Sequence, residues 1–138
     1  LTIKKLNLKI VEDNSYIKKA FLKGIPVEGL GNLKEQLFGL EINFERLNAI
    51  DFKKGCYVGQ ENTARMKLKN KIRRQLMSIK TEKDLNIGDE IKYNDSVIGR
   101  ILIDKPYPFA LIKLFDPDFS VFKDKKLKIN DSNVEIIS

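Results

Sequence analysis

The stretch EIKYNDSVIGRILIDKPYPFALIKL, residues 90–114, holds three short apolar and β-branched runs. These runs are Glu90–Tyr93, Val97–Ile103 and Ala110–Leu114. Asn, Asp and Ser at 94–96 separate the first two runs, and two prolines precede the third. Short β-branched runs joined by such turn formers are typical of antiparallel strands. The stretch therefore predicts the central part of an antiparallel sheet.

Three further runs flank this stretch at Leu76–Ile79, Leu127–Ile129 and Val134–Ile137. Clusters of Asn, Asp, Gly, Ser and Pro lie between them, as in Asn130–Asn133. About six short strands with tight turns over residues 71–138 are the pattern of a small antiparallel β-barrel. We therefore expect the second half of the chain to be a six-stranded barrel domain.

Residues 1–70 show a different pattern, a mixed and largely helical one. Loose alternation over Ile3–Val11 predicts a strand, and the capping residues Asp13, Asn14 and Ser15 begin a helix that ends before Gly24. Short helices are expected near residues 33–38 and 43–49, and another from residue 57 to 69. The fold class is thus α+β, with a helical or mixed N-terminal segment (1–70) followed by the barrel (71–138).

Composition excludes several classes of site. The chain has 138 residues, no His and one Cys, so it cannot build a His-dependent triad, a His-ligated zinc site or an internal disulfide. We expect no metal site. The sequence contains no apolar run long enough to span a bilayer and no signal-peptide pattern, which leads us to expect a soluble, cytoplasmic protein. Its eight Phe residues are expected in the core.

One basic window stands out against a net charge of +7. It contains six cations and no acid: Arg65, Lys67, Lys69, Lys71, Arg73 and Arg74. Such a run is either a solvated face or a strip that binds RNA phosphates or a polyanionic cofactor tail. Lys supplies 21 of the 26 cations, and the window lacks aromatic residues that could stack on bases, which disfavours RNA.

Chemistry is concentrated in residues 53–65, KKGCYVGQENTAR. Cys56 lies at the predicted start of a helix and follows two lysines, and both features favour the thiolate. Glu61 and Arg65 have the i,i+4 spacing of a helical ion pair. A lone Cys is alternatively a small buried apolar residue, and both interpretations remain open from the residues alone.

Residues 54–61 resemble the K-G-C-Y-x-G-Q-E signature of the YgfZ family, folate-binding relatives of the glycine-cleavage T-protein. Further matches are Gly24-Ile25-Pro26, Ala64-Arg65 and Val97–Ile101. The resemblance implies a ring of domains around a folate channel, ending in a β-barrel. It implies that Lys54, Tyr57, Gln60, Glu61 and Arg65 bind or shape the site for tetrahydrofolate or a one-carbon derivative, and that Cys56 is a candidate catalytic thiol.

The resemblance also implies a function, which is to support iron–sulfur enzymes, including radical enzymes that modify tRNA. The expected partners are folate, iron–sulfur or radical enzymes as clients and, with weaker support, tRNA, with no membrane. The matched region is the C-terminal half of such proteins, so folate binding by this chain alone stays open, and apolar surface left uncovered can promote dimerisation. The alternatives are a folate-dependent aminomethyltransferase and a basic tRNA-binding module at residues 65–74.

Overall fold

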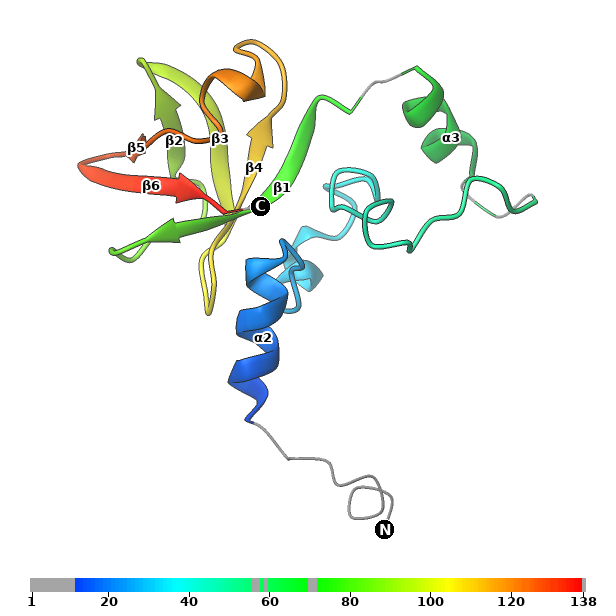
Figure 1. Ribbon diagram of the computed structural model, residues 1–138, viewed down its shortest axis with the longest axis horizontal. Helices are drawn as coiled ribbons and strands as arrows, with labels where there is room; N and C mark the ends of the chain where they lie inside the picture. The colour runs from blue at the N-terminus through cyan, green and yellow to red at the C-terminus, as the bar shows by residue number, and fades with distance from the viewer. Residues whose placement is uncertain (1–11, 56–57, 59, 70–71, 138) are drawn as a thin grey trace.

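The computed structural model describes residues 12–55, 58, 60–69 and 72–137. The first part of the chain contains α2 (Asp13–Leu22), the 3-10 helix η1 (Leu30–Leu33) and α3 (Gln60–Leu68). The second part contains a barrel, and Figure 1 shows α2 and α3 outside it. Its elements are β1 (Arg74–Thr81), β2 (Glu90–Tyr93), β3 (Ser96–Ile103), β4 (Phe109–Lys113), η2 (Phe119–Val121), β5 (Leu127–Ile129) and β6 (Ser132–Ile136).

The described strands form a closed antiparallel barrel in the order β1-β4-β3-β2-β5-β6, with β6 returning to pair with β1. The α+β prediction and the six-stranded barrel are therefore confirmed. The predicted bounds of β2 and β5 agree with the structure, and the other strands differ by one or two residues at one or both ends. The turn at Asn94 and Asp95 has positive φ at both residues, as a two-residue hairpin requires.

Alternation along the strands separates two apolar clusters. In β4, Ala110 and Ile112 point into the barrel, where they join residues of the other strands, and Phe109 and Leu111 point outward. Phe122, which follows η2, completes the interior and is fully buried. The outward cluster lies on β1, β3 and β4 and continues into the helical part of the chain.

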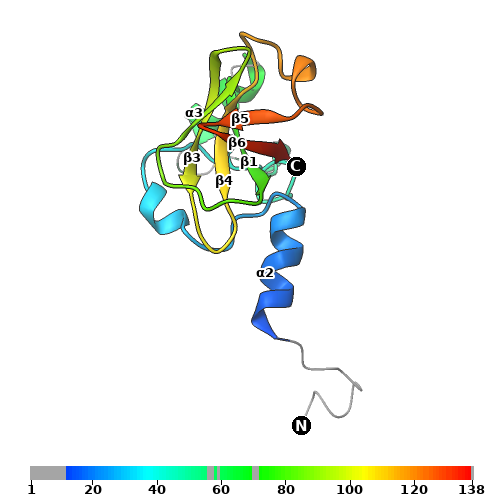
Figure 2. The same cartoon turned by 90° about the vertical axis from the view of Figure 1, so that its left-hand side faces the viewer.

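Helix α2 packs on the barrel through its C-terminal end and runs away from it (Figures 1 and 2). Phe21 stacks on Tyr107, with ring centroids 4.8 Å apart, and meets the edge of Phe109 at 5.6 Å. Burial of such aromatic rings is the main stabilising term for a helix this short. The helix thus positions the following chain against the outer face of β3 and β4.

The structure confirms the prediction that α2 ends before Gly24. Gly24 has φ of 69°, the left-handed conformation that glycine adopts without a steric penalty. Its N–H donates to the carbonyl of Phe21, and the N–H of Ile25 donates to the carbonyl of Ala20, which is a Schellman motif. The predicted cap at the other end is wrong, because Glu12 holds the N-cap position without a side-chain hydrogen bond.

The connecting segment differs from the prediction of two short helices. Residues 39–48 form hydrogen-bonded turns, and the only regular helix in the described part of residues 24–55 is η1. Glu35, Asn43 and Asn48 have positive φ, and residues in that conformation interrupt a right-handed helix. The predicted strand Ile3–Val11 lies outside the described residues.

The expectation that every Phe lies in the core is wrong for three residues. Phe38 and Phe115 are each 51% exposed, and Phe44 is also exposed. Phe21, Phe109 and Phe122 are buried as expected, whereas Phe52 and Phe119 are partly buried.

Candidate functional site

A groove of about 430 Å³ lies where α3, the start of β1 and the loop before α3 meet. Helix α3 contributes Asn62, Arg65 and Met66, β1 and the residue before it contribute Arg74 and Arg73, and the loop contributes Phe38 and Glu41. Three of the five arginines in the chain therefore face one groove. We take this groove as the candidate site because it lies between the barrel and α3, the helix in which the signature ends.

The single carboxylate of the groove is deeply buried. Glu41 is 4% exposed; its Oε1 accepts a hydrogen bond from Nε of Arg74 at 2.6 Å, and its Oε2 accepts one from the backbone N–H of Phe38 at 2.9 Å. A carboxylate taken out of water needs such charged and neutral donors. The ion pair fixes the orientation of Arg74, whose side chain is 41% exposed and faces the groove.

The loop that carries Glu41 is fastened to β1 by backbone and amide hydrogen bonds. The N–H of Leu76 donates to the carbonyl of Glu41 at 2.7 Å. The buried Asn43 donates to the carbonyls of Leu76 and Gly24, at 3.1 and 3.4 Å, and accepts from the side-chain amide of Gln75. The groove wall is therefore rigidly connected both to the barrel and to the end of α2.

Helix α3 is held mainly by polar contacts, because none of its residues is buried. Lys67 forms an ion pair with Glu45, and its ammonium lies 5.6 Å from the ring centroid of Phe52. Glu45 and Phe52 both belong to the segment that follows Glu41 and precedes the signature. These contacts place Arg65 and Met66 on the groove side of the helix.

The predicted site residues fall into three groups. Arg65 lines the groove. Lys54 and Glu61 are exposed, and Gln60 is partly buried at the first residue of α3. Cys56 and Tyr57 lie outside the described residues. No ion pair between Glu61 and Arg65 occurs among the described residues, so the expected pairing along the helix is wrong.

The basic window does not act as one strip. Arg74 is paired with Glu41 and Lys67 with Glu45, so two of its cations are compensated by acids from the preceding loop. Lys71 lies outside the described residues. Arg65 and Arg73 remain on the groove as its exposed cations.

Sequence reasoning missed Glu41 and Phe38. The signal for Glu41 was present, because it is an acid between the apolar residues Leu40 and Ile42, and an acid in an apolar run is often buried with a partner. The exposed Phe38 carries no such signal, because sequence cannot distinguish it from a core aromatic.

The chemistry of the groove is anion recognition combined with one hydrogen-bond acceptor. Guanidinium groups match carboxylates and phosphates in a bidentate geometry. Glu41 keeps lone pairs beyond its two observed bonds, since a carboxylate offers about four acceptor positions. In the described ranges no three His, Cys, Asp or Glu side chains gather as metal ligands do.

Comparison with known proteins connects about half of the chain to one group of relatives. Residues of this chain are 38% identical over 68 residues to "Iron-sulfur cluster assembly factor IBA57 homolog, mitochondrial" of Neurospora crassa. The Dictyostelium discoideum homolog is 40% identical over 76 residues, and the mouse factor is 41% identical over 68. This chain is similar to iron–sulfur cluster assembly factors.

The similarity covers 49% of this chain and between 16% and 19% of those three relatives. The chain thus corresponds to a small part of each relative's length. No protein-family model matches the chain.

The relatives correct one expectation. Their names place them in the mitochondrion, which contradicts the cytoplasmic location expected from the sequence. That expectation rested on the lack of targeting patterns, and such patterns say little about a chain that matches only part of its relatives. Among the described helices, none has the length and apolar character needed to cross a bilayer.

Proposed function

We propose that this chain is part of a folate-binding factor that supports iron–sulfur cluster assembly in the mitochondrion. The observation that carries the proposal is the groove formed by Glu41, Arg65, Arg73 and Arg74. Arg65 of the groove lies on α3, the helix in which the K-G-C-Y-x-G-Q-E signature ends, and the chain is similar to IBA57 factors. Residues 1–70 would belong to the folate-binding domain and residues 71–138 to the barrel domain that closes it.

The charged, polar and aromatic side chains of the groove match the chemical groups of a folate. The glutamate tail of a folate carries carboxylates, which Arg65 and Arg73 can bind. The pterin ring carries N–H donors, which the buried carboxylate of Glu41 can accept through its remaining lone pairs. The exposed ring of Phe38 gives the aromatic part of the ligand an apolar surface.

The chain's own residues orient and shield the ligand. Arg74 holds the Glu41 carboxylate in place through the 2.6 Å hydrogen bond, and Asn43 fixes the loop to β1. A reduced folate supplies a one-carbon carrier when bound. Lys54, Tyr57, Gln60 and Glu61 would shape the entrance, and Cys56 would be the candidate reactive thiol. The narrower role, support of radical enzymes that modify tRNA, belongs to the same proposal.

Calorimetric titration with tetrahydrofolate tests ligand binding directly. We expect saturable binding that Arg73→Gln weakens at least tenfold, since a charge-assisted bond contributes about 1.5–3 kcal/mol. The matched control is Arg100→Gln, which removes an exposed arginine of β3 opposite Glu90. Equal binding by both variants would place the ligand elsewhere, and no binding by the wild type would refute folate binding by this chain.

The cellular role needs a separate measurement. In cells whose own factor is deleted, the full-length protein should restore the activity of iron–sulfur enzymes in mitochondria. Glu41→Gln should reduce that activity, whereas Glu90→Gln, which changes an exposed residue of β2 outside the groove, should not. Restored activity with a variant that binds no folate would separate the assembly role from the ligand.

A further inference from the structure

A second group of cations lies on the barrel, outside the candidate groove. Lys92, Lys126 and Lys128 line a separate groove of about 450 Å³ beside the turns that contain Asn94 and Asn130. Among the described residues of its lining the only acid is Asp95, so three ammonium groups accompany one carboxylate. All three lysines are exposed. The net charge of this surface is therefore positive.

Two of these lysines lie where β2 and β5 are joined by a single register pair. Lys92 of β2 and Lys128 of β5 lie directly opposite each other, and theirs is the register pair that joins these two strands. Both project outward, because their strand neighbours Ile91, Leu127 and Ile129 are buried inside. Like charges placed opposite each other across two strands destabilise the pairing.

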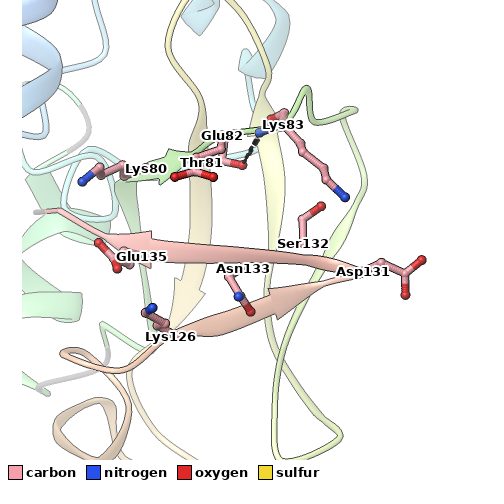
Figure 3. A pocket seen from close by; sticks show the side chains of 9 residues that line it. All are labelled: Lys80, Thr81, Glu82, Lys83, Lys126, Asp131, Ser132, Asn133 and Glu135. Atoms are coloured by element: carbon pink, nitrogen blue, oxygen red, sulfur yellow. Dashed lines mark hydrogen bonds between the residues drawn. The ribbon is translucent and has the colours of Figure 1, made fainter.

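The neighbouring groove shows what a compensated surface looks like. It lies across β1 and β6 (Figure 3), where Lys80 is directly opposite Glu135. Its lining shares Lys126 with the lysine groove and contains three lysines and three acids in all: Lys80, Lys83, Lys126, Glu82, Asp131 and Glu135. Opposite charges stabilise that strand pair, whereas the β2–β5 pair lacks such compensation in its described lining.

The side chains of the lysine groove suit a ligand that carries several negative charges. Lysine binds phosphate as a point charge with rotatable donors. Three such charges along one groove suit a ligand with repeated negative charges.

The aromatic residue of the groove, Tyr93, already contacts two other side chains. The ring of Tyr93 has the Lys125 ammonium 5.2 Å from its centroid and the ring of Phe122 at 5.9 Å. Its hydroxyl accepts a hydrogen bond from Nζ of Lys125 at 2.7 Å. A nucleobase therefore finds no open aromatic face here, and stacking is the usual route to binding single-stranded bases.

We propose that this lysine groove binds the phosphate backbone of a nucleic-acid strand without reading its bases. The bound phosphates bridge Lys92 and Lys128 and remove their repulsion, so binding also stabilises the barrel. This site is separate from the folate groove, and the two proposals stand or fall independently.

Fluorescence anisotropy with labelled 12-nucleotide oligo(U) and oligo(A) tests the proposal. We expect equal affinity for both sequences and a slope of log K against log salt of about −2, from roughly 0.7 per phosphate over three contacts. Lys92→Gln with Lys128→Gln should lower the slope by about 1.4 and weaken binding at least tenfold at low salt. The matched control, Lys80→Gln with Lys83→Gln, removes two lysines from the compensated side and should bind as the wild type does.

A second measurement distinguishes loss of binding from misfolding of the double variant. The oligonucleotide should raise the melting temperature of the wild type at low salt, since a ligand of the folded state stabilises it, and Lys126→Gln alone should reduce that rise. Equal loss in the control pair, loss only with Arg73→Gln, a clear preference for one base, or equally tight binding of poly-glutamate would each overturn the proposal.

Discussion

Nε of Arg74, the first residue of the barrel, lies 2.6 Å from Oε1 of Glu41, 33 residues earlier in the chain. The carboxylate is buried, and the guanidinium bridges the interior of the loop and the open groove. One ion pair therefore both joins the helical part to the barrel and sets the charge of the candidate site. A change at Glu41 should consequently affect stability and ligand binding together.

Replacing Glu41 by Gln should destabilise the protein by about 1–2 kcal/mol. This lies below the 3–5 kcal/mol for breaking a fully buried pair, because the exposed part of Arg74 can regain water. Urea unfolding measures the loss. Glu45→Gln, which removes the exposed partner of Lys67, should change stability by less than about 0.5 kcal/mol. Equal effects would mean that burial of Glu41 contributes nothing.

Asn43→Ala should cost about 2–4 kcal/mol in the same assay. The change leaves the carbonyl of Leu76 without the amide that bonds it at 3.1 Å and places alanine at a positive φ of 66°, and these are additive penalties. Asn48→Ala is the matched control, because Asn48 has φ of 55° but is exposed. It should lose only the backbone part, about 1 kcal/mol. A control loss as large as that of Asn43→Ala would contradict the role of the amide.

Gly99→Ala should destabilise the barrel by about 1–3 kcal/mol through overpacking. A methyl group at Gly99 would lie 2.7 Å from both the carbonyl oxygen of Leu111 and Cδ1 of Ile112 on the neighbouring strand. The backbone oxygen cannot move without breaking the β3–β4 pairing. Gly31→Ala meets nothing within 4 Å and should be nearly neutral. Thermal unfolding of both variants distinguishes crowding from a general glycine effect.

The turn before η2 should show a pH-dependent local contact. The Ser120 hydroxyl, and then its backbone N–H, hold the pKa of Asp118 below its ordinary value of 3.8. A lowered pKa favours the folded turn above the ordinary value and loses that contribution as the pH falls through the folded pKa. NMR titration of the Asp118 carboxyl should show this shift, and Ser120→Ala should raise the pKa towards 3.8. An unchanged titration in Ser120→Ala would refute the hydroxyl as its main cause.

The barrel could be predicted because the residues that define each strand and turn are neighbours in the sequence. Each strand is a short apolar run between turn formers, and the hairpin at Asn94 and Asp95 adopts the positive φ that such residues favour. The strand bounds at β2 and β5 follow directly from where those turn formers stand. The end of α2 is equally local, because Gly24 and Pro26 determine it together.

The candidate site was less predictable because its contacts are distant in sequence. Arg65 was expected at a site, but its neighbours Phe38 and Glu41 come from a loop more than twenty residues earlier. The helix expected at residues 43–49 failed because Asn43 adopts a left-handed conformation to bond Leu76 and Gly24. Tertiary hydrogen bonds override the helical spacing there, and the spacing of apolar residues in the sequence does not reveal such bonds.

Because β6 returns to β1, every strand of residues 74–136 has a neighbour on both sides. The sheet therefore has no free edge strand there to which a second copy could add a strand. Self-association through this region must therefore use side chains, such as the exposed Phe115 and Val121. Point substitutions on the surface can then tune solubility without rebuilding the fold.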